Sequence, residues 1–192
     1  MEKDTPPKRL GSSASIRHSY ESSLSACARL LAYATGEMPG DDSPIGQRQD
    51  VLAQEDLTTF AIHARRLVES TISTKSTSAV TVDGVYDGAK GGIPITRIFN
   101  LIIHHKRLEI HRTDSVFQVA MHFKKAGNID PLLALDIKSN FIPAFCLVTS
   151  DRDNIAGFRI KDLVEIFAKE VLLAIISYCE ERQLYLYDPL MD

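Results

Sequence analysis

Apolar residues recur every three or four positions in two long segments near the start of the chain, which predicts two amphipathic helices. The first is expected over residues 16–35, with Gly36 just past its end. The second is expected over about 51–73, with Asp50 placed to cap it. The intervening stretch, GEMPGDDSPIG, combines glycine, proline and aspartate and therefore predicts a loop.

The segment 74–92 is rich in serine, threonine and glycine, and it predicts an irregular connection. It contains GAKGG at 88–92, which lacks the remainder of a phosphate-binding loop pattern and is interpreted as a flexible linker. A third helix is predicted from Pro94 to about Lys106, because proline suits the first helical turn and apolar residues recur after it at helical spacing.

The hydrophobic period changes to two after this helix, which indicates strands. Strands are predicted over 108–111 and 116–124 as a hairpin, then over 132–138 and 145–149. Their short connections favour antiparallel pairing. A long helix is predicted over about 158–182. The expected fold is therefore α+β: a helical bundle with an inserted antiparallel sheet of about four strands and a long C-terminal helix.

The chain length of 192 residues favours a single domain. Residues 1–15 are polar and predict a loose N-terminal tail, and residues 16–192 form the expected α+β domain. The net charge of −3 argues against a surface built throughout to neutralise phosphates, but it leaves room for a local basic patch.

Three cysteines, Cys27, Cys146 and Cys179, have no metal-like spacing and an odd count, so they are interpreted as buried apolar side chains. No residue pattern predicts a metal site or a cofactor. The start of the chain has no signal-peptide pattern, and the longest apolar runs are far shorter than the roughly 20 residues of a membrane span. A cytoplasmic protein without membrane contact is expected.

Candidate chemistry lies on the third predicted helix. Asn100 and His104 are four residues apart and share a face, and Arg97 falls on nearly the same stripe two turns before His104. A cation, an amide and an imidazole are thus aligned. The opposite side of the helix is apolar and consists of Ile98, Phe99, Ile102 and Ile103.

This segment, with six residues between Arg97 and His104, resembles the motif of the HEPN (higher eukaryote and prokaryote nucleotide-binding) superfamily, in which an arginine precedes a histidine on a helix of a bundle. FAIHARRLVE at 60–69 is also similar to the preceding helix of such bundles, so the resemblance covers about half the chain. It implies a metal-independent ribonuclease or an RNA-binding relative, often from toxin–antitoxin or phage-defence systems, acting as a homodimer.

The resemblance implies catalytic roles that are chemically sensible. The His104 imidazole can accept the proton of an RNA 2′-hydroxyl, and Arg97 can hold the scissile phosphate. Asn100 is placed to orient the imidazole or a phosphate oxygen. His105, one residue on, should point away from this group.

Two alternatives to this RNA-directed function stay open. Asn100 and His104 could simply hydrogen-bond neighbouring elements, in which case the protein is a non-enzymatic interaction module with a protein partner. The second alternative is an enzyme acting on a small molecule through His111, His122 or the acidic loop SDRDN at 150–154. A second reason to expect a homodimer is the broad apolar stripe of the last predicted helix. This stripe is formed by Leu163, Val164, Phe167, Val171, Ile175 and Tyr178.

Overall fold

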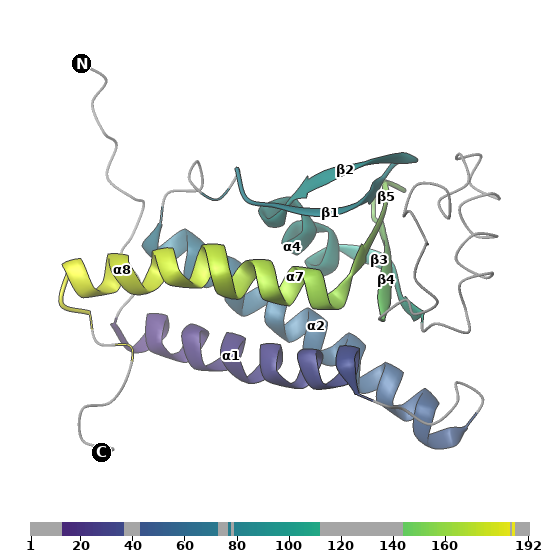
Figure 1. Cartoon of the computed structure of the whole chain (residues 1–192), viewed down its shortest axis with the longest axis horizontal. Helices are drawn as coiled ribbons and strands as arrows, with labels where there is room; N and C mark the ends of the chain where they lie inside the picture. Colours follow the sequence, from purple (N-terminus) through teal and green to yellow (C-terminus); the bar gives the residue numbers. More distant parts are fainter. Residues whose placement is uncertain are drawn as a thin grey trace.

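The protein folds into an α+β structure in which helices cover one face of a five-stranded antiparallel sheet (Figure 1). The computed structural model describes residues 13–36, 43–72, 77, 79–111, 144–184 and 186. In these ranges the sheet has five strands in the order β2 (Ala89–Pro94), β1 (Thr81–Tyr86), β5 (Ile155–Arg159), β4 (Phe145–Ser150) and β3 (His105–His111). The predicted α+β class and the C-terminal helix are confirmed.

The first two helices, α1 (Ser13–Thr35) and α2 (Pro44–Thr71), pack along each other. Both begin earlier than predicted. Residues 13–15, expected in the tail, belong to α1. Helix α2 is capped by Ser43, whose Oγ accepts a hydrogen bond from the Gly46 N–H at 2.9 Å, with Pro44 following the cap.

Asp50 is therefore not a cap. It lies inside α2, and its carboxylate accepts a hydrogen bond of 2.6 Å from the Tyr33 hydroxyl of α1. The apolar pattern placed the start of α2 too late because the first turns of this helix bury little: Ile45, Val51 and Leu52 are all exposed.

The segment predicted as an irregular connection forms a hairpin of β1 (Thr81–Tyr86) and β2 (Ala89–Pro94). The expectation of a flexible linker at 88–92 was wrong. Asp87 and Gly88 form the two-residue turn and have positive φ angles of 47° and 83°, as a type I′ hairpin turn requires. The hairpin escaped the pattern analysis because most of β2 is exposed and carries no apolar alternation.

The motif helix α4 (Ile95–Ile103) is shorter than predicted, with Pro94 as its cap. His105 and Lys106 leave the helix and start β3 (His105–His111), which extends the strand predicted over 108–111. The apolar side of α4 faces the core as expected, since Ile98, Phe99 and Ile102 are fully buried. Phe99 contacts the rings of Phe60 from α2 and Phe167 from the last helix.

Strands β4 (Phe145–Ser150) and β5 (Ile155–Arg159) join the two halves of the sheet. The strand predicted over 145–149 is confirmed, whereas 116–124 and 132–138 lie outside the described residues. Gly157 and Phe158 are in β5, so the last helix starts two residues later than predicted. Strands from both sides of α4 therefore build the sheet.

Side chains of β4 alternate between two apolar clusters. Cys146 and Val148 join the main core beneath the helices, while Phe145 and Leu147 form a smaller cluster with Val85. This two-sided burial explains why β4 is a continuous apolar run instead of an alternating pattern.

The last helix is continuous through α7 (Ile160–Ile166), a π-helical segment η2 (Phe167–Leu172) and α8 (Leu173–Glu181). Its apolar stripe is already covered within one chain, because α7 packs on α1 and the sheet while α8 packs on α2. Leu163, Phe167, Val171 and Ile175 are each 0% exposed. The stripe thus gives no support to a homodimer, which stays a prediction.

Candidate functional site

An open pocket of about 560 Å³ lies where α4 meets the β4–β5 turn. Five parts of the chain contribute to it: α2, β1, α4, the residue that follows α4, and the β4–β5 turn. Its lining is strongly polar and consists of Arg65, Tyr86, Arg97, Asn100, Leu101, His104, Ser150, Asp151, Arg152 and Asn154.

The three residues singled out from the sequence all line this pocket. Arg97 and Asn100 are exposed on α4. His104 is the residue that ends the helix, and its N–H still donates to the Asn100 carbonyl oxygen at 3.0 Å. The spacing of four residues therefore places both side chains at the pocket even though His104 is no longer within α4.

The side chains of Asn100 and His104 are available to a ligand. Both are exposed, and neither forms a side-chain hydrogen bond with any residue in the described part of the chain. The alternative of two polar groups satisfied by neighbouring elements therefore finds no support among these residues.

Arg97 is positioned by an aromatic ring. Its guanidinium carbon lies 5.1 Å from the centre of the Tyr86 ring, a cation–π contact between α4 and β1. The Tyr86 hydroxyl accepts a hydrogen bond of 2.8 Å from the Asn154 side-chain amide. A tyrosine hydroxyl can both accept and donate, and no group of the described residues accepts the proton of Tyr86.

The β4–β5 turn is held by the side chain of Ser150. The Ser150 Oγ accepts hydrogen bonds from the N–H groups of Arg152 and Asn154, each at 3.2 Å. Asp153 in this turn has a positive φ of 60°. The Asp151 N–H donates to the His104 carbonyl oxygen at 3.3 Å, which joins the turn to the end of α4.

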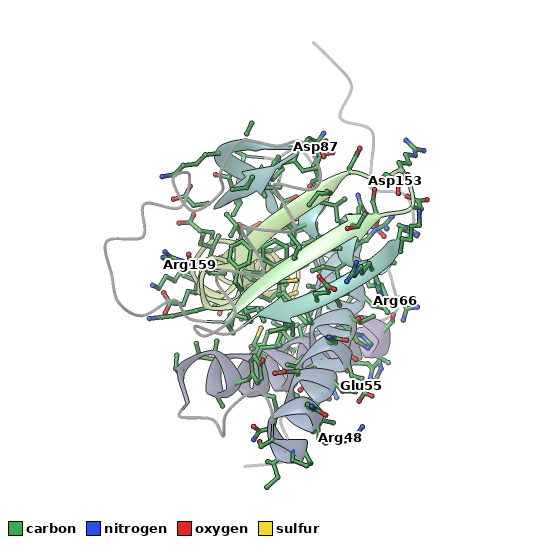
Figure 2. All side chains as sticks on the ribbon, turned by 90° about the vertical axis from the view of Figure 1, so that its right-hand side faces the viewer. Arg48, Glu55, Arg66, Asp87, Asp153 and Arg159 are labelled. Carbon is green, nitrogen blue, oxygen red and sulfur yellow. The ribbon has the colours of Figure 1, made fainter. Side chains whose placement is uncertain are left out.

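The basic residues after His104 do not line the pocket. The His105 ring Nδ1 donates to the Ile102 carbonyl oxygen at 2.6 Å, so this ring points elsewhere, as expected. Lys106 pairs with Asp153 at 3.0 Å, and Arg107 pairs with Glu109. Figure 2 shows Asp153 near the end of the β4–β5 hairpin.

Four lining residues, Arg65, Tyr86, Arg152 and Asn154, were not identified from the sequence. Arg65, Arg152 and Asn154 come from segments distant along the chain from α4, and Tyr86 comes from β1, which β2 separates from α4. Nothing in the local pattern distinguishes these residues from ordinary surface positions. The side chains of the turn at 151–154 reach the pocket because β3 and β4 pair.

The charge of the pocket suits an anion. Three arginines face it, against a single carboxylate from Asp151. Guanidinium groups bind phosphate through paired hydrogen bonds, and the amide of Asn100 can donate a further one. The overall negative charge of the chain thus coexists with a local basic site.

No group of three or more histidine, cysteine, aspartate or glutamate side chains is arranged to hold a metal ion in the described ranges. The cysteines are free and buried, as predicted. Burial raises the pKa of the Cys27 thiol to about 12 and raises the pKa values of Cys146 and Cys179 as well. All three thiols are therefore poor nucleophiles.

Among the residues searched, no helix is both long and apolar enough to cross a membrane. Comparison with family models, with curated proteins and with solved structures gave no significant match to this chain. The HEPN resemblance therefore stays a prediction.

Proposed function

We propose that this protein binds single-stranded RNA in the arginine-lined pocket and cleaves it without a metal ion. The main support is that Arg97, Asn100 and His104 line one open pocket, and none of their side chains forms a hydrogen bond or an ion pair within the described residues. Single-stranded RNA suits this site because its phosphates and 2′-hydroxyls are accessible to side chains.

The proposed reaction uses His104 as the general base. Its imidazole removes the proton of a 2′-hydroxyl, and the resulting oxygen attacks the adjacent phosphorus. The bond from phosphorus to the 5′-oxygen breaks, and that oxygen takes a proton from water, while the His104 imidazolium gives its proton to the hydroxide that remains. The products are a 2′,3′-cyclic phosphate and a free 5′-hydroxyl. Arg97 binds the scissile phosphate and stabilises the negative charge that develops on its oxygens.

The wild-type protein should cleave single-stranded RNA in the presence of EDTA and should leave DNA of the same sequence intact, because DNA lacks the attacking 2′-hydroxyl. A denaturing gel of end-labelled oligonucleotides measures both results. Binding without cleavage would reduce the proposal to an RNA-binding protein. Neither binding nor cleavage would favour the non-enzymatic interaction module.

A homodimer is part of the same proposal, since the HEPN resemblance implies that two motif helices act together. We expect sedimentation equilibrium at micromolar concentration to give about twice the mass of the 21.3-kDa chain. Two exposed apolar side chains, Ile45 at 63% and Leu173 at 59%, are candidate contacts. A monomer throughout this concentration range would contradict the dimer and leave the single pocket to act alone.

A further inference from the structure

Two arginines of the pocket have no role in the proposed cleavage step. Arg65 comes from α2 and Arg152 from the β4–β5 turn, so they approach the pocket from elements other than α4. Arg97 and His104 suffice for one phosphodiester, which carries one negative charge. A single phosphate does not require the two remaining guanidinium groups.

Arg152 is fixed through its backbone, while its charge is unpaired. Its N–H is held by the Ser150 Oγ, and the Asp153 N–H closes the same turn by donating to the Ser150 carbonyl oxygen at 3.0 Å. Its side chain is exposed, and no carboxylate in the described ranges forms an ion pair with it. A guanidinium in this state is ready to bind an anion.

Arg65 has a partner that a phosphate can displace. Its Nε lies 2.8 Å from Glu69 Oε1 one helical turn away, and the two side chains are 37% and 49% exposed. Exposed pairs at this spacing are weak. A phosphate can therefore contact the free side of the guanidinium, or replace Glu69, at the cost of only a weak interaction.

We propose that Arg65 and Arg152 form a second phosphate-binding position beside Arg97, so that the substrate is an RNA strand of at least three nucleotides. This inference rests on the proposed function. The pocket volume of about 560 Å³ leaves room for more than one phosphate and its sugar. The free proton of the Tyr86 hydroxyl provides an uncharged donor between β1 and the turn.

The length of a bound oligonucleotide tests this position directly. The probes are fully 2′-O-methylated RNAs of two, three, four and eight nucleotides, which carry one, two, three and seven phosphates and have no 2′-hydroxyl to react. Competition against a labelled octanucleotide gives their affinities. Wild-type affinity should rise by about three- to tenfold with the second phosphate.

Arg65→Gln and Arg152→Gln should each weaken octanucleotide binding by about three- to tenfold. Each should also reduce the slope of log affinity against log salt by about 0.7, since one phosphate contact is lost. Neither should change the affinity of the dinucleotide, which is held at Arg97. The matched control is Arg66→Gln, which removes the same charge from the neighbouring, exposed residue of α2 that does not line the pocket.

Arg48→Gln is a second control, because Figure 2 shows Arg48 and Arg66 toward opposite ends of α2. Both controls should bind every probe as the wild type does. Equal losses in Arg65→Gln and the two controls would overturn the second position, as would equal losses for the dinucleotide and the octanucleotide. A wild type that binds no probe would instead overturn the proposed function, and this inference with it.

Glu69→Gln gives a test with the opposite sign. It removes the carboxylate that competes for Arg65, so octanucleotide binding should strengthen by about twofold while dinucleotide binding stays the same. This variant retains every arginine, and its expected effect is tighter binding. Misfolding would weaken binding, so it cannot account for this result. Weaker octanucleotide binding by Glu69→Gln would contradict the role of Arg65.

Discussion

Replacing His104 by alanine is expected to slow RNA cleavage by about 10²–10⁴-fold, the usual effect of removing a general base. His104 is the only histidine that lines the pocket among the described residues. The substitution should affect folding little, because the ring is exposed and makes no hydrogen bond within those residues. Rates on a single-stranded oligonucleotide under single-turnover conditions measure the effect on the chemical step.

His105→Ala is the matched control for this experiment. His105 is also exposed and is the next residue in the chain, but its ring is bound to the Ile102 carbonyl oxygen and does not line the pocket. Its replacement should leave the cleavage rate within a few-fold of the wild type. Full activity in His104→Ala, or activity that EDTA removes from the wild type, would exclude the proposed mechanism.

Replacing Phe99 by alanine is expected to reduce the free energy of unfolding by about 3–5 kcal/mol, the cost typical of removing a buried phenylalanine side chain. Phe99 is 0% exposed and packs edge-to-face on Phe60, with ring centres 5.6 Å apart, and on Phe167, at 6.1 Å. Phe60 and Phe167 contact each other at 5.0 Å. The three rings therefore join α4 to α2 and to the last helix.

Urea denaturation followed by circular dichroism measures this loss. Leu52→Ala is the control, because Leu52 is 42% exposed and its truncation should change stability by no more than about 0.5 kcal/mol. Phe99→Leu should lie between these variants, since it retains most of the apolar volume but loses the ring contacts. A loss below about 1 kcal/mol in Phe99→Ala would contradict the role of this cluster.

The Phe99 variant also bears on the pocket. Phe99 lies on the buried side of α4, between Arg97 and Asn100 in the chain. The contacts that fix α4 against α2 and the last helix thus determine where these two polar side chains stand. If the site works as proposed, Phe99→Ala should impair RNA binding at temperatures where the protein is still folded.

Local periodicity in the sequence correctly identified the helices that bury one clear face. Helices α1, α2 and α4 were predicted near their true positions, because burial against the core imposes the apolar spacing. The strand β4 was identified from a short continuous apolar run, since both of its faces are buried. The buried side of α4 and the shared stripe of Arg97, Asn100 and His104 followed from the same pattern. These features depend on neighbours within a few turns of the chain.

The secondary structure was predicted wrongly in segments where the local sequence pattern favours more than one structure. Asp87-Gly88 is a strong hairpin signal. The hairpin was not predicted because β2 contains exposed glycines and the segment before β1 is rich in serine and threonine, a composition typical of an irregular connection. The capping by Ser43 was missed because the first turns of α2 bury few apolar groups. Phe158 was assigned to the last helix because a short apolar run fits a strand and a helix equally well.

The sequence by itself determined the α+β class, the polar stripe on α4 and the burial of the three cysteines. Only the tertiary structure decided that this stripe faces a pocket, and that Arg65, Tyr86, Arg152 and Asn154 complete it. Those residues come together because α2 packs on α4, and because β1 pairs with β5 and β3 with β4 in a sheet that adjoins α4. Pairing between distant strands depends on the packing of the whole core, so no local pattern in one sequence records it.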